Sequence, residues 1–194
     1  MISDAETRGG AVSFRALKLF ESIGRLGSVR RAAEECALSQ PAVTQALAKL
    51  EEQIGVTLVE RRANGSYLNE AGQIFRARAQ RFFEQVEAAF TELGVAGGAN
   101  AVRSAARRLS RSQARALVAL AERGSFAAGS EGLGISEASL QRAVRDLQSA
   151  LCKPLFYRTA AGVVVTPAGM LLGRQIKLAM QEIVWGVQEL HLAA

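Results

Sequence analysis

The chain has 194 residues, and its 24 Lys and Arg against 18 Asp and Glu give a formal net charge of +6. With 49% hydrophobic residues the composition excludes a disordered chain, and its two distant cysteines exclude a disulfide scaffold. No apolar run reaches the ~18 residues of a membrane span, and the N-terminus lacks the apolar segment of a secretory signal, so we expect no membrane association and a reducing, cytoplasmic setting.

Residues for catalysis and metal binding are scarce. His191 is the only histidine, whereas most hydrolytic and metal sites use histidine or clustered cysteine. The sequence shows no Ser/His/Asp set, no glycine-rich phosphate loop and no metal-ligand spacing. We therefore expect a protein that is not an enzyme and that holds neither a cofactor nor a metal.

The sequence repeats itself. A shift of 97 residues aligns residues 15–72 with 112–169 without a gap, and twelve positions are then identical. Apolar positions also correspond, as Ile23 does with Leu120. A period this long does not fit a solenoid, so it predicts two tandem domains.

We place the domains at 12–93 and 109–192. The intervening segment, 94–108, is rich in Gly, Ala and Arg without apolar periodicity and predicts a linker. Charge is uneven: the first 94 residues hold 12 basic and 12 acidic side chains, and the rest holds 12 and 6. Such an excess of positive charge is typical of a nucleic-acid binder, although a solvated surface also explains it.

The first domain begins with a helix that Ser13 can cap. Apolar residues recur from Phe14 to Ile23 at helical spacing, and Gly27 ends the helix. Ser28 can then cap a short second helix, Val29–Cys36.

A tight turn leads to a third helix, about Gln40–Ile54. Ser39 is its cap candidate, Pro41 suits its first turn, and Gly55 ends it. Its buried stripe is formed by Val43, Leu47, Leu50 and Ile54.

A hairpin and a long helix complete the domain. Leu58–Arg61 and Ser66–Leu68 predict two short strands around the turn Ala63-Asn64-Gly65. Asn69 can cap a helix of about 70–93. The second domain repeats this plan, with a hairpin turn at Gly162, a long helix of about 167–190, and the cap candidates Ser110, Ser125, Ser136 and Thr166.

Both long helices carry an apolar seam at heptad spacing. The seam residues are Phe75, Ala79, Phe82, Val86, Ala89 and Leu93 in the first helix, and Leu172, Ile176, Ala179, Ile183, Gly186 and Leu190 in the second. Helices of ~24 residues span about 36 Å, which exceeds a three-helix core. We therefore expect dimerisation through these helices, within one chain or between two; packing on the helix's own domain is the alternative.

Two helices joined by a tight turn and followed by a hairpin predict a helix-turn-helix with a wing. The fold class is thus mainly α, with two tandem winged helix-turn-helix domains, each followed by a long helix. The third helix turns short polar side chains away from its buried stripe, as a major-groove reader does. The DNA-binding candidates of domain one are Arg30, Arg31, Ser39, Gln40, Pro41, Ala42, Thr44, Gln45, Lys49, Arg61 and Arg62.

Domain one resembles the DNA-binding domain of the LysR-type transcriptional regulators over roughly residues 12–93. The residues that carry the resemblance are Phe20, Gly27, Ser28, Ala32, Ala33, Leu38-Ser39-Gln40-Pro41-Ala42-Val43-Thr44, Leu50, Glu51, Ile54-Gly55-Val56, Leu58, Arg61, Ala71 and Gly72. The resemblance implies transcription control, with the third helix in the major groove, the wing on the backbone or minor groove, and the long helix dimerising. Asn69 and Val59 stand where the family usually has Thr and Phe.

Domain two resembles the family less closely. Three stretches match, but Glu137 replaces the Gln of the recognition stretch. The matching stretches are Gly124-Ser125-Phe126, Leu155-Phe156-Tyr157-Arg158 and Val165-Thr166-Pro167-Ala168-Gly169. A carboxylate is repelled by phosphates unless it accepts from cytosine. This domain reads other bases, grips phosphates without reading, or serves only as a pairing partner. Its DNA-binding candidates are Ser136, Ser139, Gln141, Arg142, Arg145 and Arg158.

LysR-type regulators normally continue into a large α/β effector-binding domain, and nothing in this sequence resembles one. We therefore expect no small-molecule site in this chain, which is either a fragment of a longer regulator or a regulator without its own sensor. The expected partners are double-stranded DNA and the long helices themselves. The alternative function is a protein-interaction module on a winged-helix scaffold, in which domain two does not read bases.

Overall fold

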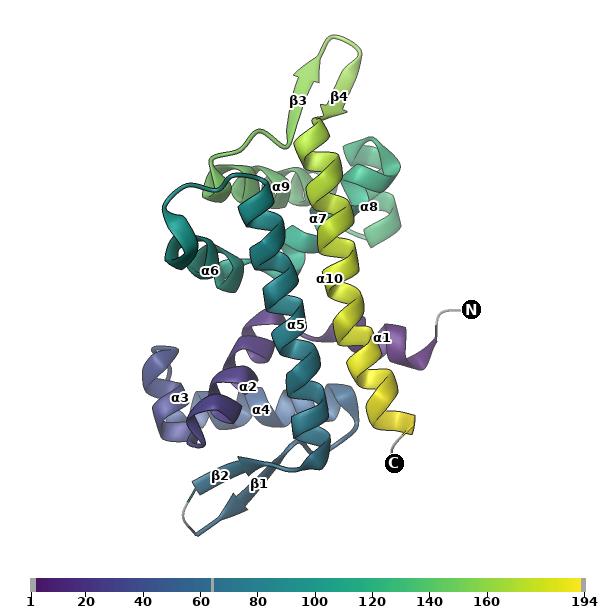
Figure 1. The fold of residues 1–194 in the computed structure, drawn as a ribbon. Coiled ribbons are helices and arrows are strands. Elements are labelled where there is room, and N and C mark those ends of the chain that lie inside the picture. The colour runs from purple at the N-terminus through teal and green to yellow at the C-terminus, as the bar shows by residue number, and fades with distance from the viewer. Residues whose placement is uncertain (1–2, 64, 193–194) are drawn as a thin grey trace. The chain divides into compact units, whose positions relative to one another are not determined.

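A computed structural model describes residues 3–63 and 65–192 (Figure 1). The described chain forms ten helices and two antiparallel hairpins. This confirms the expected mainly α fold with two winged helix-turn-helix domains in tandem. Asn64, in the turn predicted between the first two strands, lies outside the described residues.

The elements fall into two repeats of identical order. The first repeat comprises α1 (Asp4–Ala11), α2 (Phe14–Leu26), α3 (Val29–Glu35), α4 (Gln40–Ile54), β1 (Val59–Arg62), β2 (Gly65–Leu68) and α5 (Glu70–Glu92). The second repeat comprises α6 (Gly98–Arg108), α7 (Arg111–Arg123), α8 (Phe126–Leu133), α9 (Glu137–Leu151), β3 (Phe156–Thr159), β4 (Gly162–Val165) and α10 (Pro167–Leu192). The wings share one register, with Val59 opposite Leu68 and Phe156 opposite Val165.

The predicted caps are present. Hydroxyls of Ser13, Ser28 and Ser39 accept the amides that begin α2, α3 and α4, and Ser110, Ser125 and Ser136 do the same for α7, α8 and α9. Asn69 caps α5 through the amide of Gly72 at 2.8 Å, and Thr166 caps α10 through Gly169 at 2.9 Å. Asn and Thr therefore perform the same task at this position.

The structure corrects the prediction of a linker at residues 94–108. Residues 98–108 form helix α6, which buries Val102 and Ala106, instead of an irregular connection. Small residues obscured the pattern, because a face made of Ala and Val shows little apolar contrast with an Ala-rich background. Helix α1 corresponds to α6: a shift of 97 residues places its buried Ala5 and Gly9 on Val102 and Ala106. Each repeat thus begins one helix earlier than the sequence predicts.

Contacts divide the chain into two compact units. Unit 1 contains residues up to Phe82 together with those from Met180 onward, and unit 2 contains Phe83–Ala179. Each unit therefore holds one winged helix-turn-helix domain and a part of both long helices. This division differs from the domains expected at 12–93 and 109–192, because the long helices contribute to both units.

Aromatic rings fill the core of unit 1. Phe14 lies against Phe82 with ring centroids 4.6 Å apart, and Phe20 lies against Phe75 at 5.6 Å. In unit 2, Phe126 of α8 meets Phe156 of the wing edge to face at 5.1 Å. The long helix of the first repeat is thus anchored on α2 by its seam residues Phe75 and Phe82.

Candidate nucleic-acid interface

Helix α4 presents a polar face at its N-terminal half. Val43, Leu47 and Leu50 are buried, whereas Gln40, Gln45 and Lys49 are exposed. Within the described residues, these three exposed side chains take part in no hydrogen bond or ion pair. The face therefore keeps its donors and acceptors available for a ligand in solution. The other predicted residues of this helix are Pro41, which is exposed, and Ala42 and Thr44, which are half-buried.

Ser39 serves the helix structurally. Its hydroxyl accepts the amide of Ala42 at 3.3 Å, so this predicted DNA-binding residue is the cap of α4. Pro41 carries no amide N–H, and the amide of Val43 donates to the carbonyl of Ser39. Among the described residues, the amide of Gln40 is the one left free in this turn; this amide and the helix dipole favour a phosphate at this end.

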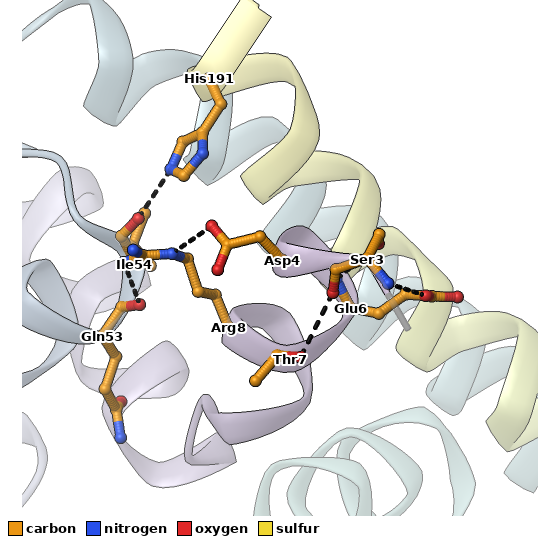
Figure 2. Close-up of polar contacts among 8 residues, drawn as sticks. All are labelled: Ser3, Asp4, Glu6, Thr7, Arg8, Gln53, Ile54 and His191. Carbon is orange, nitrogen blue, oxygen red and sulfur yellow. Dashed lines mark hydrogen bonds and ion pairs between the residues drawn. The ribbon is translucent and has the colours of Figure 1, made fainter. Parts of the chain in front are cut away.

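The C-terminal end of α4 is held by two distant segments (Figure 2). Arg8 of α1 donates to the carbonyl of Gln53 at 3.4 Å, and the ring Nε2 of His191 donates to the carbonyl of Ile54 at 2.9 Å. Asp4 orients Arg8 through an ion pair of 2.6 Å. Cationic or donor groups at this end satisfy carbonyls that lack an intrahelical partner. Helix α1 and the end of α10 thereby fix the recognition helix in unit 1.

The wing is tied to the recognition helix in both repeats. The Glu51 carboxylate of α4 accepts the amides of Leu58 and Val59 at 2.7 and 3.1 Å. In the second repeat the amide oxygen of Gln148 accepts those of Leu155 and Phe156. A carboxylate in one repeat and a carboxamide in the other thus supply the acceptor oxygen at this position.

Four arginines flank the recognition helix. Arg30 and Arg31 are exposed on α3, and Arg61 is exposed on β1. Arg62, also on β1, forms an ion pair with Glu60 at 3.1 Å, and its guanidinium lies 5.8 Å from the ring centre of Tyr67. Arg62 is therefore partly neutralised, which the sequence reasoning did not anticipate.

Helix α9 presents a different face from α4. Glu137, Arg142 and Arg145 are exposed where the 97-residue shift places Gln40, Gln45 and Ala48 in the first repeat. Asp146, which the same shift places on Lys49, is also exposed, so the face mixes two carboxylates with two guanidinium groups.

Two predicted residues of the second repeat bind each other. Arg158 of β3 donates to the side-chain oxygen of Gln141 in α9 at 2.7 Å. This contact leaves the amide NH₂ of Gln141 as its remaining donor group. Ser136 and Ser139 are likewise joined, with their hydroxyl oxygens 2.7 Å apart, and Ser136 also caps α9 through the amide of Ser139.

Sequence reasoning missed the residues that hold the reader in place. Glu51 was recognised only as part of the family resemblance, and the contacts of Arg8 and His191 were not predicted. The interactions of Arg8 and His191 span 45 and 137 residues, so no local spacing reveals them.

Metal ligands do not gather among the described residues: no group of three or more His, Cys, Asp and Glu side chains could hold an ion there. Across residues 3–63 and 65–192, no helix combines the length and apolar character needed to cross a bilayer.

Comparison with known proteins agrees with the duplicated architecture. The family model "Bacterial regulatory helix-turn-helix protein, lysR family" matches twice, at residues 14–73 and 111–170. Both the fold and these two matches define a pair of winged helix-turn-helix modules. The chain belongs to the LysR family, whose members are DNA-binding transcriptional regulators and not enzymes.

Several curated relatives are regulators of this kind. The chain is 32% identical to the HTH-type transcriptional regulator GalR of Pseudomonas putida over 167 residues, which cover 86% of this chain and 41% of that protein. It is 43% identical to the RuBisCO operon transcriptional regulator of Allochromatium vinosum over 91 residues, 45% of this chain and 30% of that protein. The chain thus spans less than half the length of these relatives. No solved structure matches it.

Proposed function

We propose that this protein is a sequence-specific DNA-binding transcriptional regulator that inserts the start of α4 into the major groove. The supporting observation is the exposed face of α4 with Gln40 at its first position and Gln45 and Lys49 farther along. A glutamine can pair with both hydrogen-bonding groups on the major-groove edge of adenine. Arg30, Arg31 and Arg61 are available to neutralise flanking phosphates. A bacterial protein that acts on the chromosome works in the cytoplasm, and this setting is part of the proposal.

Helix α9 is proposed to contact DNA with a different chemistry. Arg142 and Arg145 can bind phosphate or guanine, whereas Glu137 accepts from cytosine and is repelled elsewhere. The bond between Arg158 and Gln141 removes one acceptor from this face. The two repeats would therefore bind unlike DNA sequences.

The decisive experiment selects bound sequences from a random pool of duplex DNA. The wild-type chain, Gln40→Ala, Arg142→Ala and a control, Gln80→Ala on the exposed side of α5, are compared. Loss of preference at particular base pairs with Gln40→Ala supports base reading by α4. If Arg142→Ala also alters particular positions, α9 reads bases; if it weakens all sequences equally, α9 grips phosphates. Unchanged selection with Gln40→Ala contradicts the proposed reader.

We also propose that the two repeats pair within one chain and form a pseudo-dimer for an asymmetric site. In support, each compact unit contains segments of both α5 and α10. The competing arrangement is a homodimer in which equal repeats pair across chains. Sedimentation at micromolar concentration separates the two: a single species at twice the chain mass of 20.7 kDa contradicts the self-contained chain.

A protein-interaction module remains the second candidate, favoured by the carboxylates Glu137 and Asp146 on the exposed side of α9. The salt dependence of affinity for duplex DNA distinguishes the two functions. Binding through phosphates weakens steeply as salt rises, whereas absence of DNA binding at low salt supports the interaction module.

A further inference from the structure

Arg78 of α5 binds two carboxylates of α10 within unit 1. Its Nη1 lies 2.8 Å from Glu182, and its Nε lies 3.0 Å from Glu189, which a second nitrogen also contacts. Trp185 lies between these two glutamates in the sequence. The centre of its ring is 5.6 Å from the guanidinium carbon of Arg78. The side chains of Arg78 and Glu182 are only 17% and 7% exposed. The guanidinium lowers the pKa of Glu189, so the charges stabilise each other at neutral pH.

Unit 2 has glutamine at two of the three positions where this cluster of unit 1 is charged. The 97-residue shift relates Arg78 to Gln175, and it relates Glu182 and Glu189 to Gln85 and Glu92. Within unit 2, Gln175 of α10 donates to Glu92 of α5. The same contact therefore occurs in both units with the helices exchanged, once as an arginine with two carboxylates and once as a glutamine with one.

This difference between the two contacts affects which long helices can pair favourably. If two copies of α10 paired with the observed geometry, Gln175 of each copy would face Glu182 and Glu189 of the other. In each such contact, the carboxylates of Glu182 and Glu189 would have no cationic partner, and Glu182 is buried. A buried charge deprived of its partner is strongly unfavourable. If two copies of α5 paired instead, Arg78 would lose one carboxylate, and the apolar seam of each α10 would be left without a partner.

We propose that Arg78, Glu182 and Glu189 are specificity determinants that make α5 and α10 partners of each other and exclude pairing of α10 with a second α10. Unlike pairing is the only arrangement in which both glutamates meet an arginine. Polar and charged residues at helix interfaces set partner choice in this way. The inference does not depend on DNA binding.

Thermal unfolding of the full-length chain tests the pairing. Arg78→Glu is expected to lower the melting temperature by about 5–15 °C, because it places a third carboxylate in the cluster. The reversed cluster, Arg78→Glu with Glu182→Arg and Glu189→Arg, is expected to recover most of that loss. Gln80→Glu, which adds a carboxylate to the exposed side of the same helix, is the matched control and should change the melting temperature by about 2 °C or less. Failure of the reversed cluster to recover stability overturns the proposal.

Partner choice is tested by sedimentation velocity over a wide range of concentration. The neutral variant Arg78→Gln with Glu182→Gln and Glu189→Gln removes the repulsion between two α10 helices. It is expected to form concentration-dependent higher species, whereas the wild-type chain keeps one species. Identical behaviour of the two proteins, whether both associate or neither does, shows that the cluster does not select the partner.

Discussion

At Gly72, the first turn of α5 runs so close to the preceding segment that a side chain does not fit. A Cβ built there would lie 2.1 Å from the carbonyl oxygen of Leu58, and the corresponding Cβ at Gly169 would lie 2.2 Å from that of Leu155. The same carbonyls accept the amides of Asn69 and Thr166. A single residue type at this position therefore lets the wing return onto the start of the long helix.

We expect Gly72→Ala to destabilise the protein by about 3 kcal/mol, because the methyl group would displace backbone atoms. Gly10→Ala in α1 is the control, since a Cβ there would have no atom within 4 Å apart from its chain neighbours and its own helix backbone, and it should be neutral or stabilising. Denaturant unfolding measures both. An unchanged midpoint for Gly72→Ala would refute the close approach.

Glu51 connects the recognition helix with the wing through two backbone amides. We expect Glu51→Gln to be tolerated, because Gln148 performs the same task in the second repeat. Glu51→Ala leaves both amides without this acceptor and should cost about 1–3 kcal/mol. Chemical denaturation compares the variants; equal losses for Gln and Ala would mean that the negative charge, and not the acceptor oxygen, is what matters.

At the scale of elements, α1 and α6 are integral to their units. In unit 1, a Cβ added to Gly9 of α1 would lie 2.9 Å from the Cα of Val184 in α10, so the two helices are in backbone contact. In unit 2, Arg107 of α6 lies over the ring of Phe83 in α5 at 5.1 Å. Each long helix is thus covered by the first helix of the other repeat.

The role of α6 is testable with a buried charge. Val102 is 5% exposed, so Val102→Asp should destabilise the protein by roughly 3–5 kcal/mol through an unpaired buried carboxylate. Ser104→Asp, on the exposed side of the same helix, is the control. Calorimetry decides: if both variants melt alike, the segment is the linker that the sequence predicts.

At the scale of the whole molecule, the charge of the second repeat predicts how affinity responds to salt. If Arg142 and Arg145 each neutralise a phosphate, replacing both by Ala reduces the slope of log affinity against log salt by about 2. Arg174→Ala, an exposed change on α10, should leave the slope unaltered. Titrations of duplex DNA at several salt concentrations supply the slopes, and an unchanged slope for the double variant would remove α9 from the interface.

The sequence by itself determined the repeat, the caps, the hairpins and the exposed face of α4. These features depend on residues three or four positions apart, or on a pattern that recurs after 97 residues, so they can be read without a partner. It did not reveal α6, whose Ala-rich face gives little apolar contrast.

Only the tertiary structure decided which side chains meet when they lie far apart in the sequence. Arg78 binds residues more than 100 positions away, His191 closes the end of α4, and Arg158 occupies Gln141. Such contacts depend on how helices and wings come together in space. A heptad seam indicates only that a helix packs against a partner, and it does not identify that partner. The identity of that partner is set by the geometry that brings each charge to its counterpart.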